Sequence, residues 1–458
     1  MSRYVLGLVA LSAMTGLATA DDWPQWLGPK RDGVWRETGL VEKFPAGGPK
    51  QKWKAPVGIG YAGPAVAGGK VFLTDFAPAP GKDIPKKQFG RDKTPGTERV
   101  VCLDAATGQP LWEDKYPVEY AISYAAGPRC TPAVDGDRVY TLGAMGEFRC
   151  YNTAPGKLLW SKNFPKDYES PVPVWGFAAH PLIDGDKVIC LAGGSDDRLV
   201  VALDKMTGKQ VWASQSCLGD FGYSPPMIYT LAGKRQLVIW HTRAIVGLDP
   251  ATGKRLWRHD FDSRAALTVP TPRQVGDDKL YFSSFYHGSL MLKVGADKAE
   301  VAWKSKAKGE NRNQTTDLSS IMCTPVVEGE HIYGVCSYGE LRCIKAATGE
   351  RVWESMQATR GKLTPEKVAK LPSSDESERW SLAFLIPHGD RYFLFNEQGD
   401  LIIAKLSPKG YEEIDRARIV EPTNTARGRK VVWMHPAFAD KCVFARNDKE
   451  IVCVSLAE

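Results

Sequence analysis

The stretch Ala202-Leu-Asp-Lys-Met-Thr-Gly-Lys-Gln-Val-Trp212 recurs along the chain with almost constant internal spacing. Equally clear copies occupy residues 102–112 and 247–257. In each copy a small residue precedes Leu-Asp, a Thr-Gly turn follows, and a tryptophan stands ten positions after the start. A motif that returns at fixed spacing indicates that one structural unit is used several times.

Less regular copies extend the series. Residues 150–160 and 343–353 keep the glycine and the tryptophan but lack the aspartate, whereas residues 404–414 keep the spacing and end in Ile414. The segment before Trp303 has the tryptophan without the turn. Counted with the two ends of the chain, the copies indicate eight units.

Each unit has the pattern of four short strands. Alternating apolar residues, as in residues 138–142, are typical of half-buried antiparallel strands. Asp135-Gly-Asp137 is one of several tight turns at which glycine supplies a positive φ, so we interpret these carboxylates as hairpin residues rather than metal ligands. Consecutive tryptophans from Trp112 to Trp353 are 48, 52, 45, 46 and 50 residues apart. This period predicts an all-β, eight-bladed propeller of four-stranded antiparallel blades.

The strands predicted at the two ends of the chain add up to one four-stranded unit. The last unit supplies three strands and stops before any tryptophan, whereas residues 51–57 form an isolated strand that contains Trp53. We therefore expect the N-terminal strand around Trp53 to complete the last blade, which closes the ring and leaves no long sheet edge exposed.

The first twenty residues have the pattern of a secretory signal peptide. Arg3 precedes an apolar stretch, and Ala18-Thr-Ala20 provides small residues for cleavage before Asp21. We expect three parts: a signal peptide at 1–20, an N-terminal arm at 21–49 and the propeller at 50–458. The predicted location is periplasmic or secreted.

Composition narrows the range of partners. The formal net charge of +7 is spread along the chain instead of forming basic runs, so nucleic acid is not an expected partner. Beyond the signal peptide, no stretch approaches about 18 uninterrupted apolar residues, so no transmembrane segment is predicted. We expect a monomer.

Ten cysteines in an exported chain would ordinarily suggest a disulfide framework. Four of them, however, stand at the small-residue position of the motif, where other units have Ala202 or Gly247; these are Cys102, Cys150, Cys343 and Cys453. We interpret most cysteines as buried thiols. The alternative is a disulfide that involves Cys217 or the neighbourhood of Cys336 and Cys343.

With these motifs, the chain resembles the pyrroloquinoline-quinone-like propeller repeat family from about Lys50 to the C-terminus. The resemblance implies that each motif tryptophan lies between neighbouring blades, next to a Thr-Gly turn that joins outer strands. The structural tryptophans would then be Trp53, Trp112, Trp160, Trp212, Trp257, Trp303 and Trp353. The segment 23–33, rich in Trp, Pro and Gly, is expected to pin the arm across the propeller.

The family that the chain resembles has at least two functional classes. Quinoprotein dehydrogenases hold the quinone and usually calcium near the central axis, whereas proteins similar to BamB act as assembly scaffolds without a cofactor. The chain has neither an adjacent Cys-Cys pair nor a CxxCH haem site, and the GxSxG and HExxH signatures are absent. We therefore favour a scaffold that carries no cofactor and is not an enzyme. The alternative is an alcohol or sugar dehydrogenase that depends on pyrroloquinoline quinone and calcium.

As a scaffold, the protein would bind a protein or another partner in the periplasm or cell envelope. BamB is anchored through a lipid on a cysteine at the cleavage site, whereas Ala20 precedes Asp21 here, so a BamB-like protein without a lipid anchor is expected.

Long insertions fall in links on one face of the predicted disc, and we expect function there. Residues at the starts of inner strands should lie around the mouth of the axial channel. Tyr124 is one such residue. For a quinone, the candidates are Arg129, Trp175, His180, Tyr223, Trp380 and His435; for calcium, they are Asp220 and Asp317. The alternative is that these are ordinary polar rim residues of a propeller. No catalytic residue is identified.

Overall fold

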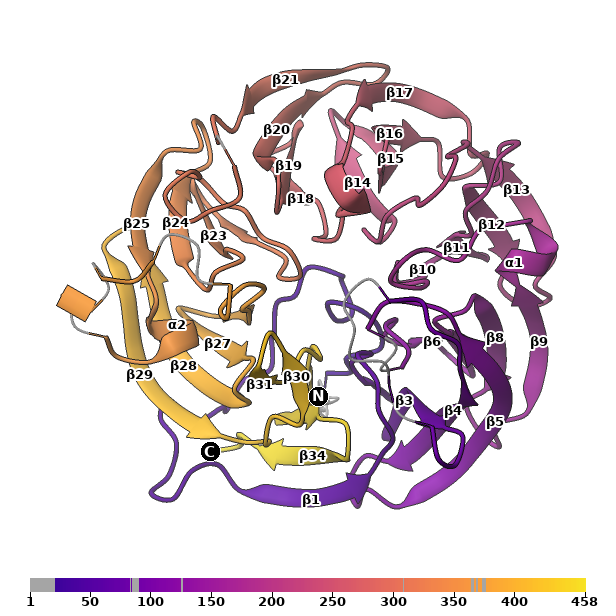
Figure 1. Ribbon diagram of the computed structural model, residues 1–458, viewed down its shortest axis with the longest axis horizontal. Helices are drawn as coiled ribbons and strands as arrows, with labels where there is room; N and C mark the ends of the chain where they lie inside the picture. Colours follow the sequence, from indigo (N-terminus) through magenta and orange to yellow (C-terminus); the bar gives the residue numbers. More distant parts are fainter. Residues whose placement is uncertain are drawn as a thin grey trace, which may run out of the picture.

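The computed structural model describes residues 21–458 with the exception of 83, 85–89, 125–126, 308, 364–365, 368–369 and 373–375. The expected signal peptide, residues 1–20, lies outside the described residues. Eight four-stranded antiparallel sheets surround a common axis (Figure 1), which confirms the predicted eight-bladed propeller. Within the described part of the chain, no helix has the length and apolar character needed to cross a membrane.

The strands follow the chain from the axis outward in seven blades. Blades 1 to 4 consist of β2 (Ala65–Ala67), β3 (Lys70–Pro78), β4 (Thr94–Asp104) and β5 (Pro110–Tyr120); β6 (Ala133–Asp135), β7 (Arg138–Leu142), β8 (Glu147–Asn152) and β9 (Leu158–Asn163); β10 (Leu182–Asp184), β11 (Lys187–Leu191), β12 (Val200–Asp204) and β13 (Gln210–Ser214); and β14 (Met227–Leu231), β15 (Lys234–His241), β16 (Ala244–Leu248) and β17 (Arg255–Asp260).

Blades 5 to 7 have the same order. They consist of β18 (Arg273–Val275), β19 (Lys279–Ser284), β20 (Gly288–Val294) and β21 (Ala299–Lys304); β22 (Val326–Glu328), β23 (His331–Val335), β24 (Leu341–Lys345) and β25 (Arg351–Ser355); and β26 (Ala383–His388), β27 (Arg391–Asn396), β28 (Asp400–Ser407) and β29 (Gly410–Arg418). The links carry the short helices α1 (Phe164–Asp167), α2 (Gln357–Arg360) and η1 (Arg264–Ala266), and the hairpin of β30 (Asn424–Ala426) and β31 (Arg429–Val431).

Blade 8 joins the two ends of the chain. Its inner strands are β32 (Ala437–Ala439), β33 (Cys442–Arg446) and β34 (Glu450–Ser455), and its outer strand is β1 (Gln51–Pro56). β1 pairs antiparallel with β34, and Trp53 lies opposite Cys453. The predicted closure of the ring by the N-terminal strand is therefore confirmed.

Motif tryptophans join neighbouring blades through two contacts. The indole N–H of Trp160 donates to the carbonyl of Lys205 in the next blade at 3.2 Å. Its ring lies so close to Gly208 that a Cβ there would stand 2.6 Å from a ring atom, and Gly208 has a φ of +71°. The same pairing joins Trp53 to Gly108, Trp112 to Gly156, Trp212 to Gly253 and Trp303 to Gly349. The glycine of this turn, which follows threonine in four of the pairs and Pro155 at Gly156, therefore supplies the surface on which the previous blade packs.

Three units depart from this pattern. Trp353 donates to the carbonyl of Ser407 in the next blade at 2.7 Å, but no atom lies within 4 Å of a Cβ placed at Gly410. Trp257 donates to Gln236 of its own blade, because the following blade lacks the Thr-Gly turn. In blade 7 the tryptophan position is occupied by Ile414. That side chain packs against the hydrophobic cluster that contains Phe44 of the N-terminal arm.

The ten cysteines are free and buried, so the interpretation as core thiols is confirmed. The small position of the motif lies directly across the sheet from the tryptophan, as in the pairs Cys102 with Trp112 and Cys150 with Trp160. At Gly247 a Cβ would stand 2.2 Å from the ring of Trp257. The position is small because the indole opposite occupies the space.

The N-terminal arm crosses the centre of the ring (Figure 1). Its hydrogen bonds reach seven blades. Arm residues are the donors in the bonds from Arg31 to the carbonyls of Pro181 and Pro226, from Trp35 to Pro387 and from Val41 to Leu456. Arm carbonyls accept from Val134 at Pro24 and from Arg273 at Asp32, and the backbones of Trp23 and Val66 pair with each other. Val66, Val134 and Pro387 belong to inner strands, which end at the tight hairpin turns. The arm therefore fills the axial channel toward the face of the tight turns.

The glycine contact makes a testable prediction. In Gly208→Ala, the left-handed backbone costs about 1–2 kcal/mol and the clash with the Trp160 ring about 1–3 kcal/mol more. Gly136→Ala is the matched control, because Gly136 has a φ of +58° and no neighbouring atom within 4 Å. Calorimetry should show a loss in Tm for Gly208→Ala at least twice that for Gly136→Ala. Equal losses would contradict the packing role of the turn.

Candidate functional site

An axial cavity of about 210 Å³ lies at the centre of the propeller. Each of the eight blades contributes residues just before its inner strand, and the arm contributes one residue. The lining consists of Trp26, Tyr61, Gly63, Tyr124, Arg129, Thr131, Trp175, Ala178, His180, Tyr223, Pro225, Leu267, Val269, Ile321, Met322, Trp380, Phe384, Trp433 and His435. The six residues predicted for a quinone and Tyr124 are therefore brought together, whereas Asp220 and Asp317 are not in the lining.

Trp26 of the arm forms the floor of the cavity. Its ring stacks on His180 with centroids 4.0 Å apart and an interplanar angle of 6°, and its edge meets His435 at 4.9 Å. The indole N–H donates to Oγ1 of Thr271 at 3.0 Å. Because the arm lies toward the tight turns, the cavity opens on the opposite face, which carries the long links.

Both histidines of the cavity are buried and held by the backbone. Nδ1 of His180 accepts a hydrogen bond from the N–H of Thr131 at 3.0 Å, and Nδ1 of His435 lies 2.7 Å from the carbonyl oxygen of Pro436. Burial lowers the pKa of His180 well below its ordinary value and lowers that of His435 to about 4. Both rings are therefore neutral at physiological pH and pack against the floor.

Three aromatic residues surround the mouth of the cavity. The ring centroid of Tyr124 lies 5.9 Å from that of Trp380, in an edge-on arrangement, and 6.1 Å from that of Trp433. Tyr124 and Trp380 have φ values of 52° and 70°. Bulky residues rarely adopt a positive φ, and such strain persists only where surrounding contacts hold it, often at functional sites. The guanidinium of Arg427 lies over the Trp380 ring at 4.7 Å.

Arg129 provides the permanent cation of the lining. Its guanidinium donates to the carbonyls of Ser123, Tyr124 and Gly127 and lies 5.2 Å from the ring centroid of Tyr61. Burial raises the pKa of Tyr61 to about 12, so its hydroxyl stays neutral. Burial lowers the pKa of Arg129, but a guanidinium titrates so far above neutral pH that it keeps its charge. Within the described residues, the groups that interact electrostatically with Arg129 are tyrosines and Cys130, and no carboxylate is among them.

Asp220 lies behind the wall of the cavity. Its carboxylate accepts hydrogen bonds from the Tyr223 hydroxyl at 2.6 Å and from the backbone N–H groups of Val174 and Gly222 at 2.9 and 3.1 Å. These bonds connect the β9–β10 link with the β13–β14 link. Asp220 therefore holds Tyr223 and the segment around Trp175 in place.

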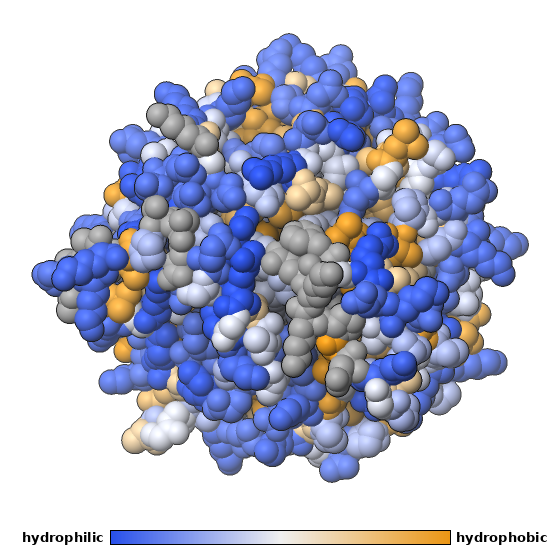
Figure 2. Space-filling model, viewed as in Figure 1, coloured by the Kyte–Doolittle hydropathy of each residue, from blue (hydrophilic) through white to orange (hydrophobic). Residues whose placement is uncertain are grey.

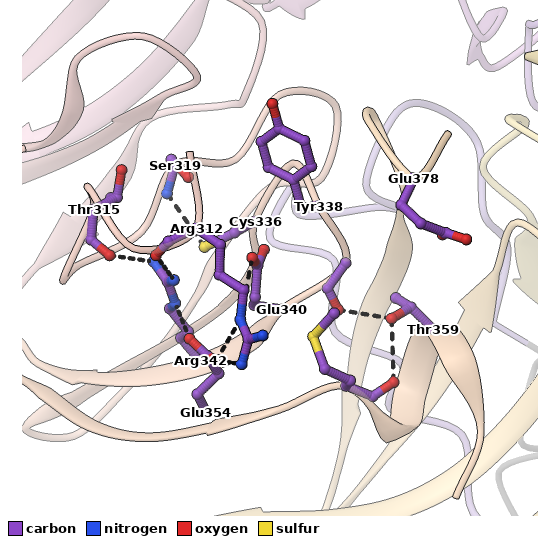
Figure 3. A network of polar contacts seen from close by, with 12 residues as sticks. Arg312, Thr315, Ser319, Cys336, Tyr338, Glu340, Arg342, Glu354, Thr359 and Glu378 are labelled. Carbon is purple, nitrogen blue, oxygen red and sulfur yellow. Dashed lines mark hydrogen bonds and ion pairs between the residues drawn. The ribbon is translucent and has the colours of Figure 1, made fainter. Parts of the chain in front are cut away.

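Asp317 is buried in the β21–β22 link, and burial raises its pKa to about 6. The link is attached to blade 6 by a network that sequence reasoning missed (Figure 3). Arg342, fully buried, donates to the carbonyls of Thr315 and Asp317 at 3.0 and 2.7 Å and to the carboxylate of Glu354 at 2.9 Å. Because the same link continues to Ile321 and Met322, the network positions one wall of the cavity.

Sequence reasoning also missed Trp26, Tyr61 and Trp433 in the lining. Trp26 belongs to the segment 23–33, which was expected only to pin the arm. Trp433 lies two positions before His435 in the same link, so the sequence predicted this part of the lining through His435 but not Trp433 itself. The indole N–H of Trp433 donates to the buried carboxylate of Glu397 at 3.0 Å.

The lining does not match the requirements of calcium and pyrroloquinoline quinone. Calcium takes six to eight oxygen ligands, with carboxylates prominent among them. No carboxylate is present among the described residues of the lining, and the oxygens of Asp220 already accept hydrogen bonds. Among the described residues, no group of three or more His, Cys, Asp or Glu side chains is arranged to hold a metal. The quinone carries three carboxylates, whereas the lining residues that the structure describes include one permanent cation, Arg129.

The buried histidines predict an acid-sensitive fold. His435 has a folded pKa of about 4, below its ordinary value of about 6.5, so its stabilising contribution is complete above pH 6.5 and is lost as pH falls toward 4. At roughly 1.4 kcal/mol per pKa unit, the loss approaches about 3 kcal/mol. Tm measured from pH 6.5 to 4 should fall less steeply in His435→Gln than in the natural chain. Parallel slopes would refute a neutral, buried His435.

Comparison with known proteins agrees with this architecture. A family model described as outer membrane protein assembly factor BamB matches residues 96–355. BamB of Shewanella oneidensis is 22% identical over 262 residues, which cover 56% of this chain and 63% of that protein. The first curated relatives are matched over 52–63% of their own length.

Two solved structures have the same fold. BamB from Moraxella catarrhalis aligns with a TM-score of 0.53 and 16% identity, covering 89% of this chain and 97% of that chain. Quinohemoprotein alcohol dehydrogenase ADHIIG from Pseudomonas putida HK5 aligns with a TM-score of 0.57 and 10% identity, covering 95% and 80%. Both share the ring of blades with this protein. With the family model matched over more than half of its residues, the chain belongs to the pyrroloquinoline-quinone-like propellers described as outer membrane protein assembly factor BamB.

Proposed function

We propose that this protein is an exported scaffold that binds a protein partner in the cell envelope through the face that carries the long links. Membership of the BamB family supports this function, since that family is described by its role in outer membrane protein assembly. The proposed contact surface is the linker face, defined as the mouth of the axial cavity and the links that surround it.

The observation that carries the proposal is the one-sided cavity. Every blade contributes to the lining, and Trp26 closes the cavity from the arm side. A partner can therefore enter only from the linker face. The strained backbone at Tyr124 and Trp380 holds aromatic rings at the mouth before any partner arrives. Such preorganisation lowers the entropy lost on binding.

The surroundings of the mouth suit a polypeptide partner. Aromatic and arginine side chains, which are enriched at the centres of protein interfaces, lie together here as Tyr124, Trp380, Trp433 and Arg427. Leu218, in the β13–β14 link, is 79% exposed. Figure 2 shows a largely hydrophilic surface with small hydrophobic patches, some of them near the centre of the disc.

Chemistry at the cavity is a weaker explanation of these residues. Its histidines are neutral and hydrogen-bonded to the backbone, and its tyrosines keep their protons, as the raised pKa of Tyr61 illustrates. The lining therefore supplies packing surfaces and one cation. These groups recognise a partner without transferring protons or electrons.

Site-specific photocrosslinking tests the proposal in intact cells. A photoreactive phenylalanine at Leu218 probes the linker face, and the same residue at Asp186, in the β10–β11 turn of the same blade, is the matched control. We expect a discrete protein adduct from Leu218 and little from Asp186, with the adduct retained in envelope fractions.

Two results would contradict this function. Adducts of equal yield from both positions would show that contact is not specific to one face. Adducts from Asp186 alone would place the contact surface on the tight-turn side, where the arm lies.

A further inference from the structure

We propose that the axial cavity binds a small carboxylate that carries one aromatic ring, with the ring between the aromatic walls and the carboxylate on Arg129. This is a binding site for a free small molecule, and it goes beyond the partner-binding scaffold. It also differs from a quinone site, because neither a metal nor a second ring is required.

The size of the cavity sets the limit of one ring. Its volume is about 210 Å³. An apolar protein cavity of about 150 Å³ is enough to hold benzene. The remaining space accommodates a short side chain with a carboxylate.

The walls suit an aromatic ring. Trp175, Trp380 and Trp433 provide indole surfaces, and Leu267, Val269 and Ile321 provide aliphatic contacts between them. Aromatic rings in edge-to-face or offset contact gain about 0.5–1.5 kcal/mol beyond the burial of their surface. These walls come from five different blades, so their spacing is fixed by the ring itself.

The charge of the lining selects an anion. Among the described residues, three of the five N–H donors of Arg129 bond backbone carbonyls. The other two have no acceptor within that part of the chain and can serve a ligand. None of the described residues that line the cavity carries a carboxylate. A partly buried cation without a counterion is costly, and a carboxylate would remove that cost through charge-assisted hydrogen bonds.

A second unused donor stands at the mouth. Trp380 is 8% exposed, and its indole N–H has no hydrogen-bond acceptor within the part of the chain that the structure describes. Buried donors are nearly always satisfied in folded proteins. The ligand therefore meets one cation and one further N–H donor, while the two histidines, being neutral, add no charge.

Calorimetric titration of the purified chain with 3-phenylpropionate tests the proposal. We expect a dissociation constant between about 10 µM and 1 mM, in keeping with the small number of ligand atoms. 3-Phenylpropionamide has the same shape without the charge and should bind at least tenfold more weakly. Propionate, which has no ring, should show no binding over the same range.

Variants separate the roles of charge and shape. Arg129→Gln should weaken binding of the acid at least tenfold and leave binding of the amide unchanged, whereas Arg129→Lys should restore part of the loss. Arg264→Gln is the matched control, because Arg264 lies over Tyr286 at 4.4 Å outside the lining and should bind like the natural chain.

The proposal fails if the natural chain does not bind 3-phenylpropionate, or if the acid and the amide bind equally. That comparison needs no variant, so it holds even if Arg129→Gln does not fold. Because the photocrosslinking experiment uses no ligand, a negative titration leaves the scaffold function standing, and a negative crosslink leaves the small-molecule site standing.

Discussion

The contact between a motif tryptophan and the turn glycine of the next blade is the interaction on which the ring depends. In five joints the indole lies against a glycine of positive φ, as Trp160 does against Gly208. Each contact fixes the angle between two blades, and repetition of one angle closes a circle. Where the series is interrupted at Ile414, the arm contributes Phe44 to the same hydrophobic cluster. The axial cavity exists because these joints hold eight inner strands at a constant radius.

The fold was predictable because the residues that form its repeating contact lie close together in the sequence. The small residue, the Thr-Gly turn and the tryptophan lie within eleven positions, and the structure places Cys102 directly across from Trp112. Ring closure was also predictable. The strand that contains Trp53 belonged to no other repeat unit, and the last unit had three strands and no tryptophan. The path of the arm was not, because its contacts depend on single residues such as Arg31 that reach backbone carbonyls far away in sequence.

The candidate site was predictable in position and less so in chemistry. Residues before inner strands must face the axis, and for that reason Arg129, Tyr223 and His435 were identified correctly as neighbours of one cavity. The orientation of a carboxylate cannot be read in this way. Asp220 turned out to bond Tyr223 and two backbone N–H groups behind the wall. Whether such residues hold a ligand depends on side-chain packing between links, which no repeat pattern encodes.

The pairing of β1 with β34 has a consequence for the order of synthesis. The first strand to leave the ribosome finds its partner only when the last strand has been made, nearly 400 residues later. Until then, the growing chain has an unsatisfied sheet edge at each end. A chain truncated anywhere before β34 lacks the strand that pairs with β1, so both sheet edges stay open to pairing with another chain.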